Sequence, residues 1–391
     1  MTPAARVQAA IEILDLVIAA ARNNGAPADR IVSDWFKSRR FAGSGDRRAV
    51  RDLVFRAIRS CGEVPMTGRA AMLLLAQDDA TLSGLFDGSR HAPEPIRPDE
   101  PAAERGIAPA WLVDALERSG IEGTEASALL DRAPLDIRVN TLRSGSAEVP
   151  PGGERTAAPN GWRYPHGTAI EATPAWTTGT IEVQDTGSQL ACEAVAARAG
   201  ESVIDLCAGG GGKTLALAAA MDGSGRLLAT DTDRTRLSRL PPRAERAGAG
   251  MIETRLLDPN REAEQLSDWQ GQADAVLVDA PCSGTGTWRR NPEARWRLTP
   301  AQLQRYVTVQ ARLLDVAAGL VRPGGRLVYV TCSLLDDEGA TQAQAFLDRA
   351  GSGWTAEPPV LPAGRPRGPG LRLTPAHDGT DGFFIARFRL L

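Results

Sequence analysis

Residues 202–214 read SVIDLCAGGGGKT, an apolar run that ends at an acid and is followed by four consecutive glycines and a lysine. An unalternating run of this length is typical of a strand that is buried on both faces of a parallel sheet. Glycines leave the backbone open to a ligand, and the amides at a helix N-terminus favour negative groups. The stretch therefore predicts a strand, a ligand-binding loop and a helix that begins near Lys213.

Three more apolar runs share this pattern and predict an α/β fold. Helical stretches separate the runs, as right-handed crossovers between parallel strands require. Ligands of such sheets bind beyond the carboxyl ends of the strands, so functional residues are expected where the runs stop. The predicted strands are Ser202–Leu206, Arg226–Thr230, Ala275–Asp279 and Arg326–Thr331.

The glycine loop is compared with three classes of nucleotide-type ligand. A dinucleotide fingerprint lacks its third glycine, because Thr214 and Leu215 occupy the positions where it would stand. A phosphate-binding Walker loop misses by one residue, since Cys207 stands in place of its first glycine. S-adenosylmethionine needs a glycine turn and then a carboxylate for the ribose hydroxyls, which Asp231 at the end of the next strand provides. Asp258 is expected to accept from the adenine amino group, or else to be a loop or capping aspartate.

Two of the predicted strands end in cysteine motifs, DAPCSGTGT (Asp279–Thr287) and TCS (Thr331–Ser333). Methylation at carbon 5 of a pyrimidine needs cysteine chemistry, because that carbon is a poor nucleophile until a thiolate adds at carbon 6. A free thiol of pKa about 8.5 is only about 3% thiolate at pH 7, so the site must lower that pKa or supply a base. Asp279 can share a proton with ring nitrogen 3, since desolvation favours a protonated carboxyl. A buried structural thiol is the alternative for each cysteine.

The first 90 residues predict a helical domain with a basic surface. Apolar residues recur with helical spacing within residues 7–18 and 50–58. Residues 30–60 carry an excess of six positive charges, although the whole chain has a net charge of -3. Such a window attracts phosphate locally, or it is a solvated helix face. Its basic residues are Arg30, Lys37, Arg39, Arg40, Arg47, Arg48, Arg51, Arg56 and Arg59.

Composition predicts a soluble, cytosolic protein without a zinc site or disulfide framework. No run approaches the roughly 18 apolar residues of a membrane span, and Glu12 and Asp15 interrupt the apolar N-terminal stretch. The five cysteines form no C-x-x-C pair, and the three histidines lie far apart. Further along the chain, we predict a proline-rich connector at residues 91–104, a short helix at 111–116, a strand at 134–143 and a loop at 144–160.

Taken together, these motifs resemble the RsmB (Sun/Fmu-type) ribosomal RNA cytosine-5 methyltransferases, which carry a NusB-like N-terminal domain. The resemblance spans nearly the whole chain, and DAPCSGTGT followed by TCS about 50 residues later is its most specific feature. The other matching stretches are SGDRRAVRDLVFRAIR (Ser44–Arg59), IRVNTLR (Ile137–Arg143), VQDTGSQ (Val183–Gln189), DLCAGGGGKT (Asp205–Thr214), RRNPEARW (Arg289–Trp296) and DGFFIARF (Asp381–Phe388).

The resemblance implies an α/β fold with a Rossmann-like S-adenosylmethionine-dependent methyltransferase sheet, an N-terminal all-α NusB-like domain and a small linking subdomain. We expect the helical RNA-binding domain and its proline-rich connector in residues 1–130, the small α/β RNA-binding subdomain in 131–180 and the catalytic domain in 181–391. A monomer that acts on small-subunit ribosomal RNA, without a membrane partner, is expected.

The resemblance also implies a role for each site residue. Cys332 would be the nucleophile, and Cys282 would be the second cysteine that assists release of the methylated product. Asp279 would contact the target cytosine and border the cofactor. No metal is implied. The residues implied to bind S-adenosyl-L-methionine are Cys207, Ala208, Gly209, Gly210, Gly211, Gly212, Lys213, Asp231, Asp258 and Asp279.

The chain departs from the family pattern in two places. Family members usually carry Ala-Pro where this chain has Gly209 and Gly210, so the loop loses the fixed φ of proline and is entropically looser by roughly 0.5–1 kcal/mol. This departure bears on the affinity for the cofactor. Residues 144–170 also read as short and loop-like beside the small RNA-binding subdomain of the family.

The expected function is methylation of carbon 5 of a cytosine in RNA, most of all 16S ribosomal RNA, through a covalent cysteine adduct at carbon 6. Arg289, Arg290 and Arg295 either hold RNA phosphate near the pocket or lie in a solvated loop. The alternatives for the whole chain are a non-catalytic RNA-binding or ribosome assembly factor and a P-loop-like nucleoside triphosphatase.

Overall fold

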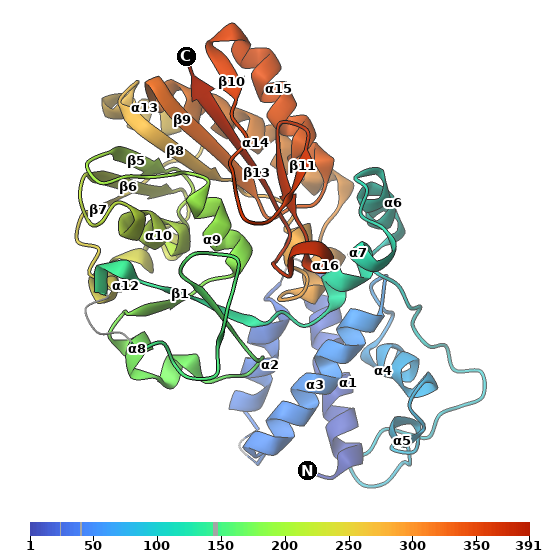
Figure 1. Cartoon of the computed structure of the whole chain (residues 1–391). Coiled ribbons are helices and arrows are strands. Elements are labelled where there is room, and N and C mark those ends of the chain that lie inside the picture. Colours follow the sequence, from blue (N-terminus) through green and yellow to red (C-terminus); the bar gives the residue numbers. More distant parts are fainter. Residues whose placement is uncertain (24, 40, 144–147) are drawn as a thin grey trace. The chain divides into compact units, whose positions relative to one another are not determined.

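The computed structural model describes residues 1–23, 25–39, 41–143 and 148–391 (Figure 1). The chain forms two compact units, one of Met1–Asp131 with Thr287–Thr299 and one of Arg132–Gly286 with Pro300–Leu391. The basic residue Arg40 and part of the loop predicted at 144–160 lie outside the described residues. The division into three domains stays a prediction, and residues 287–299, which it assigns to the catalytic domain, pack within the first unit.

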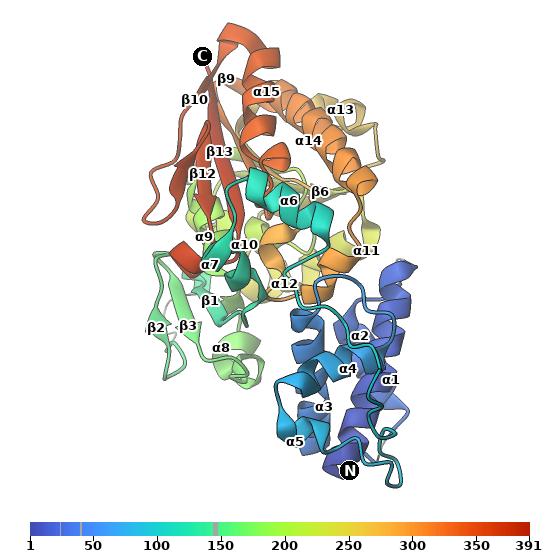
Figure 2. The same cartoon turned by 90° about the vertical axis from the view of Figure 1, so that its right-hand side faces the viewer.

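The first unit is helical, as its apolar spacing predicts. Helices α1, α3 and α4 pack along one another (Figure 2), and their buried face includes Val7, Leu14 and Val54. α1 begins where the Thr2 hydroxyl accepts the Ala5 N–H at 3.2 Å and a proline occupies the first turn. The helices are α1 (Pro3–Arg22), α2 (Ala28–Lys37), α3 (Ser44–Ser60), α4 (Gly68–Gln77), α5 (Ala80–Ser83), α6 (Ala110–Arg118) and α7 (Gly123–Ser127).

The segment 287–299 completes the first unit through Arg295, whose side chain is fully buried. The Arg295 guanidinium donates to the carbonyls of Ile58 at 2.6 Å and Cys61 at 2.8 Å, which end α3. Burial lowers the pKa of Arg295 to about 10. Both interpretations of Arg295, as a phosphate contact and as part of a solvated loop, are therefore wrong, because the guanidinium is withdrawn from solvent and caps a helix. Arg289 is also buried, at 6% exposure.

The second unit contains a sheet with the strand order β11-β12-β13-β9-β8-β5-β6-β7, and β10 pairs with β13. The strands from β9 to β7 are parallel, and β13 is antiparallel to β9. All four predicted strands are present, which confirms the α/β class and the Rossmann-like sheet. The bounds are β5 (Ser202–Asp205), β6 (Arg226–Asp231), β7 (Ile252–Leu256), β8 (Ala273–Asp279), β9 (Val321–Thr331), β10 (Trp354–Ala356), β11 (Arg365–Arg367), β12 (Gly370–Leu373) and β13 (Phe383–Leu390).

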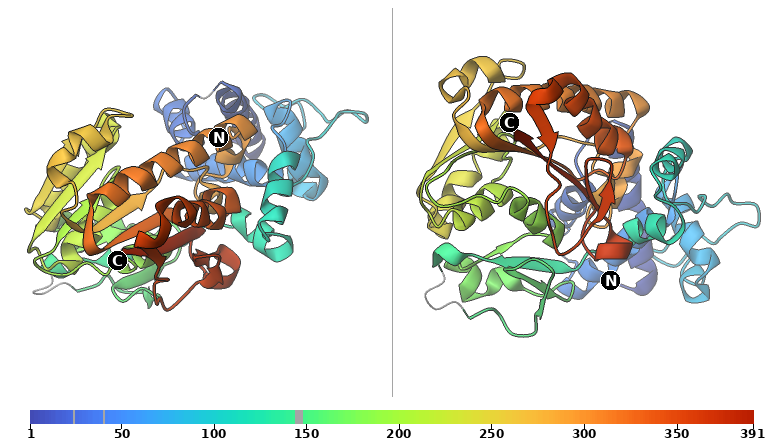
Figure 3. Two further views of the ribbon diagram at one scale, coloured as in Figure 1. Left: turned by 90° about the horizontal axis from the view of Figure 1, so that it is seen from above. Right: turned by 45° about the horizontal axis from the view of Figure 1, so that its top comes forward.

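Helices cover both faces of this sheet, which explains the unalternating apolar strands. Val203 packs with the helices α9, α10 and α12, whereas Ile204 packs on the opposite face with α14 and α15. Figures 1 and 3 show the two helical layers. None of the helices within the described ranges is both long and apolar enough to span a membrane. The helices of this unit are α8 (Pro174–Thr177), α9 (Thr186–Glu193), α10 (Gly212–Ala220), α11 (Arg234–Leu237), α12 (Leu240–Ala247), α13 (Glu262–Gln265), α14 (Pro300–Leu320), α15 (Ala340–Ala350) and α16 (Pro375–Asp378).

A second, antiparallel sheet in this unit has the order β2-β3-β1-β4. Its core contains Ile137, Tyr164 and Ile181. The strand predicted at 134–143 is confirmed for its first half, and the loop predicted at 144–160 contains the short strand β2. The bounds are β1 (Leu135–Val139), β2 (Glu154–Arg155), β3 (Gly161–Tyr164) and β4 (Ile181–Val183).

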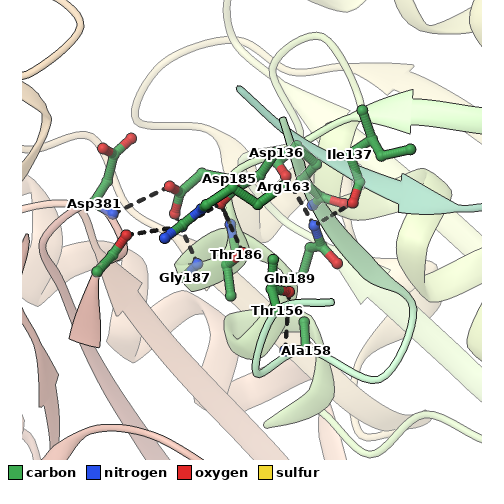
Figure 4. Close-up of polar contacts among 12 residues, drawn as sticks. Asp136, Ile137, Thr156, Ala158, Arg163, Asp185, Thr186, Gly187, Gln189 and Asp381 are labelled. Atoms are coloured by element: carbon green, nitrogen blue, oxygen red, sulfur yellow. Dashed lines mark hydrogen bonds and ion pairs between the residues drawn. The ribbon is translucent and has the colours of Figure 1, made fainter. Parts of the chain in front are cut away.

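A buried aspartate joins the small sheet to the start of α9 (Figure 4). Asp136 receives two bonds from Arg163, at 2.7 and 2.8 Å, and two from the backbone and hydroxyl of Thr186. Although burial opposes ionisation, these donors lower the pKa of Asp136. Asp185 caps α9 and also accepts the Asp381 N–H at 3.1 Å. The network thus fixes the C-terminal stretch that begins at Asp381 against the helix beside the main sheet.

Candidate active site

The carboxyl ends of the parallel strands bring the predicted site residues to one edge of the sheet. Asp231 is the last residue of β6 and Asp279 the last of β8, while Cys332 directly follows β9. β8 and β9 are neighbouring strands, and Asp279 of β8 pairs with Val330 of β9, two residues before Cys332. The loop from Cys207 to Lys213 follows β5 and leads into α10. The sequence therefore predicts correctly which residues share this edge.

The sulfur atoms of Cys282 and Cys332 lie 3.4 Å apart. Both side chains are partly accessible, and the carbonyl of Cys332 accepts the Gly286 N–H at 2.9 Å, which links the two cysteine loops. The hydrogen bond with Cys332, together with burial, raises the pKa of Cys282 well above its ordinary value. At this distance, either sulfur can donate a hydrogen bond to the other.

Lys213 extends from the first turn of α10 to Asp279, and its ammonium lies 2.7 Å from the carboxylate. Burial works to lower the pKa of Lys213, but the charge of Asp279 and the hydrogen bond to it, with contributions from other neighbouring groups, together raise it. The Lys213 ammonium also lies 5.5 Å from the centre of the Phe383 ring. The sequence places Lys213 only in the cofactor loop, whereas the structure brings it to Asp279. Because the positive charge of Lys213 is already paired with Asp279, this arrangement does not favour the nucleoside triphosphatase alternative, in which the lysine would bind phosphate.

The glycine loop and Asp231 form a cradle that fits S-adenosyl-L-methionine. Asp231 accepts the N–H groups of Gly209 at 2.8 Å and Asp233 at 2.7 Å, one on each carboxylate oxygen. Each oxygen keeps a second lone pair, so the carboxylate can still accept two ribose hydroxyls. A Cβ added at Gly212 would meet no atom within 4 Å, which leaves space above the start of α10.

Asp258 lies beyond β7, the neighbour of β6, and its side chain is 61% exposed. Its backbone N–H donates to Gln265 at 2.7 Å, and its carboxylate accepts from the same amide at 3.0 Å. This reciprocal pair holds the loop in one orientation. Its contact with the adenine amino group stays a prediction.

Asp205 is a functional candidate that the sequence reasoning did not single out. It is fully buried, and while Oδ2 accepts the Thr214 hydroxyl at 2.7 Å, no described residue bonds Oδ1. Burial raises the pKa of Asp205 to about 7, and the nearby charge of Asp279 adds to the effect. Its position as the acid that ends the first strand is the signal that could have identified it.

The basic surface of the first unit is partly neutralised in the structure. Arg30 and Lys37 both pair with Asp34, and Arg51 pairs with Asp29. Arg47 and Arg48 are exposed on α3. Asp34 is already counted in the excess of six charges, whereas Asp29 lies outside residues 30–60, so its pairing with Arg51 partly offsets that excess. RNA docking on this helix stays a prediction.

Gly209→Ala is expected to lower the free energy of unfolding by about 1–2 kcal/mol and to weaken cofactor binding, because Gly209 has a φ of 54° in the left-handed region. The added Cβ would also lie 2.6 Å from the guanidinium of Arg236. Gly210→Ala is the control, since its Cβ would meet Arg243 at 3.6 Å, an ordinary contact. Urea denaturation measures the free energy of unfolding, and calorimetric titration measures the affinity for the cofactor. Equal stability of the two variants would contradict the backbone strain expected for an alanine at position 209.

Comparisons with known proteins place this site in a family. Residues 192–389 match the model described as 16S rRNA methyltransferase RsmB/F. The chain is 33% identical to the ribosomal RNA small subunit methyltransferase B of Citrobacter koseri, over 72% of this chain and 66% of the relative, just under two thirds of its length. It is 30% identical to the same enzyme of Escherichia coli O6:K15:H31, over 78% of this chain and 73% of the relative.

Among solved structures, the crystal structure of PH0851 superposes with a TM-score of 0.78 at 25% identity, covering 99% of both chains. S-adenosyl-L-methionine is the cofactor of this methyltransferase fold, and the glycine loop with Asp231 fits it. The family match covers more than half of the chain and contains both cysteines, Asp231 and Asp279. The chain therefore belongs to the RsmB/F family of 16S rRNA methyltransferases.

Proposed function

We propose that this chain methylates carbon 5 of a cytosine in 16S ribosomal RNA through a transient covalent bond between Cys332 and carbon 6. The observation that carries this proposal is the 3.4 Å separation of the two sulfurs, beside the pair formed by Lys213 and Asp279. A single structural thiol would need neither a second cysteine nor a charged pair at the same sheet edge.

The proposed cycle assigns one task to each of these side chains. The target base leaves its stack so that carbon 6 is accessible. The Cys332 thiolate adds to carbon 6, and a proton passes from Lys213 through Asp279 to ring nitrogen 3 as electron density builds on the ring. Bound S-adenosyl-L-methionine supplies the methyl group for carbon 5. A base then takes the carbon 5 proton, the electron pair of that C–H bond re-forms the carbon 5–carbon 6 double bond, and the carbon 6–sulfur bond breaks. Cys332 leaves as a thiolate, which Cys282 stabilises.

The contact between the two sulfurs supports this division of roles. The hydrogen bond to Cys332 and burial raise the pKa of Cys282. A thiol at 3.4 Å can stabilise a negative sulfur on its neighbour and can return a proton to it at release.

Asp231 and the Cys207–Lys213 loop would hold the cofactor, and Asp258 would contact its adenine.

Methyl transfer from labelled cofactor to 16S ribosomal RNA tests the proposal. We expect tritium from the methyl group to appear in the RNA and, after nuclease digestion, to co-migrate with 5-methylcytidine. Bisulfite mapping of RNA from cells that lack this chain would then locate the modified nucleotide. Tight RNA binding without incorporation would favour the assembly-factor alternative, and label in another nucleoside would contradict the carbon 5 chemistry.

A further inference from the structure

A buried carboxyl group that the proposed cycle does not use lies next to the cysteine loops. Glu338, the last residue of the short 3-10 helix Asp336–Glu338, has no exposed surface. Its Oε1 accepts the Ser283 backbone N–H at 2.9 Å and the Gln310 amide at 3.0 Å, and its Oε2 is bonded to the Ser283 hydroxyl. Burial raises the pKa of Glu338. A carboxyl group withdrawn from water is tolerated only with such partners.

The hydrogen bonds continue from Ser283 to the second cysteine loop. Ser283 Oγ lies 3.1 Å from Ser333 Oγ, and Ser333 Oγ lies 3.2 Å from the Thr285 hydroxyl. Ser283 directly follows Cys282, and Ser333 directly follows Cys332. Because one peptide unit separates each serine from its cysteine, a change in the serine pair would move the two sulfurs relative to each other.

Two elements of the main fold hold this network in place. Gln310 of α14 is fully buried and donates to the carbonyl of Pro281, the residue before Cys282, at 3.0 Å. The hydroxyl of Tyr329 in β9 donates to the backbone carbonyl of Glu338 at 2.7 Å. Residues of β9 and α14 therefore hold Glu338 in place, and Glu338 in turn holds the loop that carries Cys282 through its bond to the Ser283 N–H.

We propose that Glu338 is a positioning residue that, through Ser283 and Ser333, sets the separation of the Cys282 and Cys332 sulfurs. In this role Glu338 contacts neither RNA nor cofactor. The catalytic meaning of the inference rests on the proposed function, whereas the sulfur separation can be measured without RNA.

Crosslinking by diamide tests the positioning directly. Diamide takes two electrons and two protons from adjacent thiols, so that a disulfide forms and diamide is reduced to its hydrazine. The sulfurs must approach from 3.4 Å to about 2.05 Å, so the rate reports how closely they are held. We expect the Cys282–Cys332 crosslink to form about 10-fold more slowly in Glu338→Ala than in the unaltered chain, with Glu338→Gln intermediate because it keeps one acceptor oxygen.

The matched control is Glu262, another buried glutamate, which pairs with Arg312 of the same helix α14. Glu262→Ala is expected to lose stability but to crosslink at the unaltered rate. In RNA methylation, Glu338→Ala should lower kcat about 10-fold while the KM for RNA and the Kd for the cofactor stay within about twofold. Ser333→Ala, which removes a single hydroxyl, should slow crosslinking even if Glu338→Ala fails to fold.

Crosslinking of Glu338→Ala at the unaltered rate, or equal slowing in Glu262→Ala, would overturn the positioning role. If the unaltered chain transfers no methyl group but the crosslinking series is graded as expected, the positioning stands and the proposed function fails. The two inferences are therefore separable by one set of variants.

Discussion

Replacement of Cys332 by alanine is expected to lower methyl transfer to RNA at least about 1000-fold, because the sulfur assigned to add to carbon 6 is lost. Replacement of Cys282 by alanine is expected instead to leave the protein bound to RNA, since the adduct forms but lacks the sulfur that assists release. The first effect is measured with tritiated cofactor. The second is measured as a protein–RNA band that survives denaturant.

Cys192 provides the matched control for these substitutions. It is buried on α9, and burial raises its pKa to about 12, so it stays an unreactive thiol. Cys192→Ala should transfer methyl groups at the unaltered rate and should form no adduct. An adduct in Cys332→Ala would reverse the two roles, and methylation by a Cys282→Ala/Cys332→Ala double variant would exclude the covalent cycle.

Replacement of Asp279 by asparagine is expected to lower kcat by about 10²–10⁴, the usual contribution of proton transfer by a positioned side chain. An amide cannot share a proton with ring nitrogen 3, and the Lys213 ammonium, only 11% exposed, would lose its carboxylate. Single-turnover rates at saturating cofactor measure the effect. Saturating cofactor separates this effect from any weaker binding of S-adenosyl-L-methionine, since Asp279 is also expected to border the cofactor.

Asp231→Asn is the contrasting variant. Loss of a charged acceptor for the ribose hydroxyls corresponds to about 1.5–3 kcal/mol, so the Kd for the cofactor should rise roughly 10- to 100-fold. Its single-turnover rate at saturating cofactor should stay near that of the unaltered chain. If Asp279→Asn weakens only cofactor binding, proton sharing by Asp279 is wrong.

The sequence predicts four buried parallel strands of the main sheet, but it misses the edge strand β7 and the antiparallel strands β12 and β13. β5, β6, β8 and β9 are covered on both faces, so their apolar runs stand out. β7 lies at the edge of the sheet, where Glu253 and Thr254 are exposed, and its composition gives no such run. β2 has only two residues, both exposed, within a stretch rich in glycine and proline. Burial, more than β-propensity, makes these strands visible in the sequence.

Residues of the site are predictable where a strand end or a dense motif marks them. The two cysteines, Asp231 and Asp279 all follow apolar runs, and parallel pairing brings them together. The contacts of Glu338 and Arg295 depend instead on partners 55 and 237 residues away, Ser283 and Ile58. No local pattern encodes such distant pairing, so a buried glutamate and a helix-capping arginine both read as surface charges.

The inclusion of residues 287–299 in the first unit has a consequence for biosynthesis. The helices of that unit leave the ribosome first, yet the guanidinium that caps α3 is Arg295, which is translated more than 230 residues after Ile58. The N-terminal helices must therefore wait, incompletely capped, while most of the methyltransferase sheet is made. A fragment cut after residue 131 would lack that arginine permanently, and one that starts at 132 would carry it without its carbonyl partners.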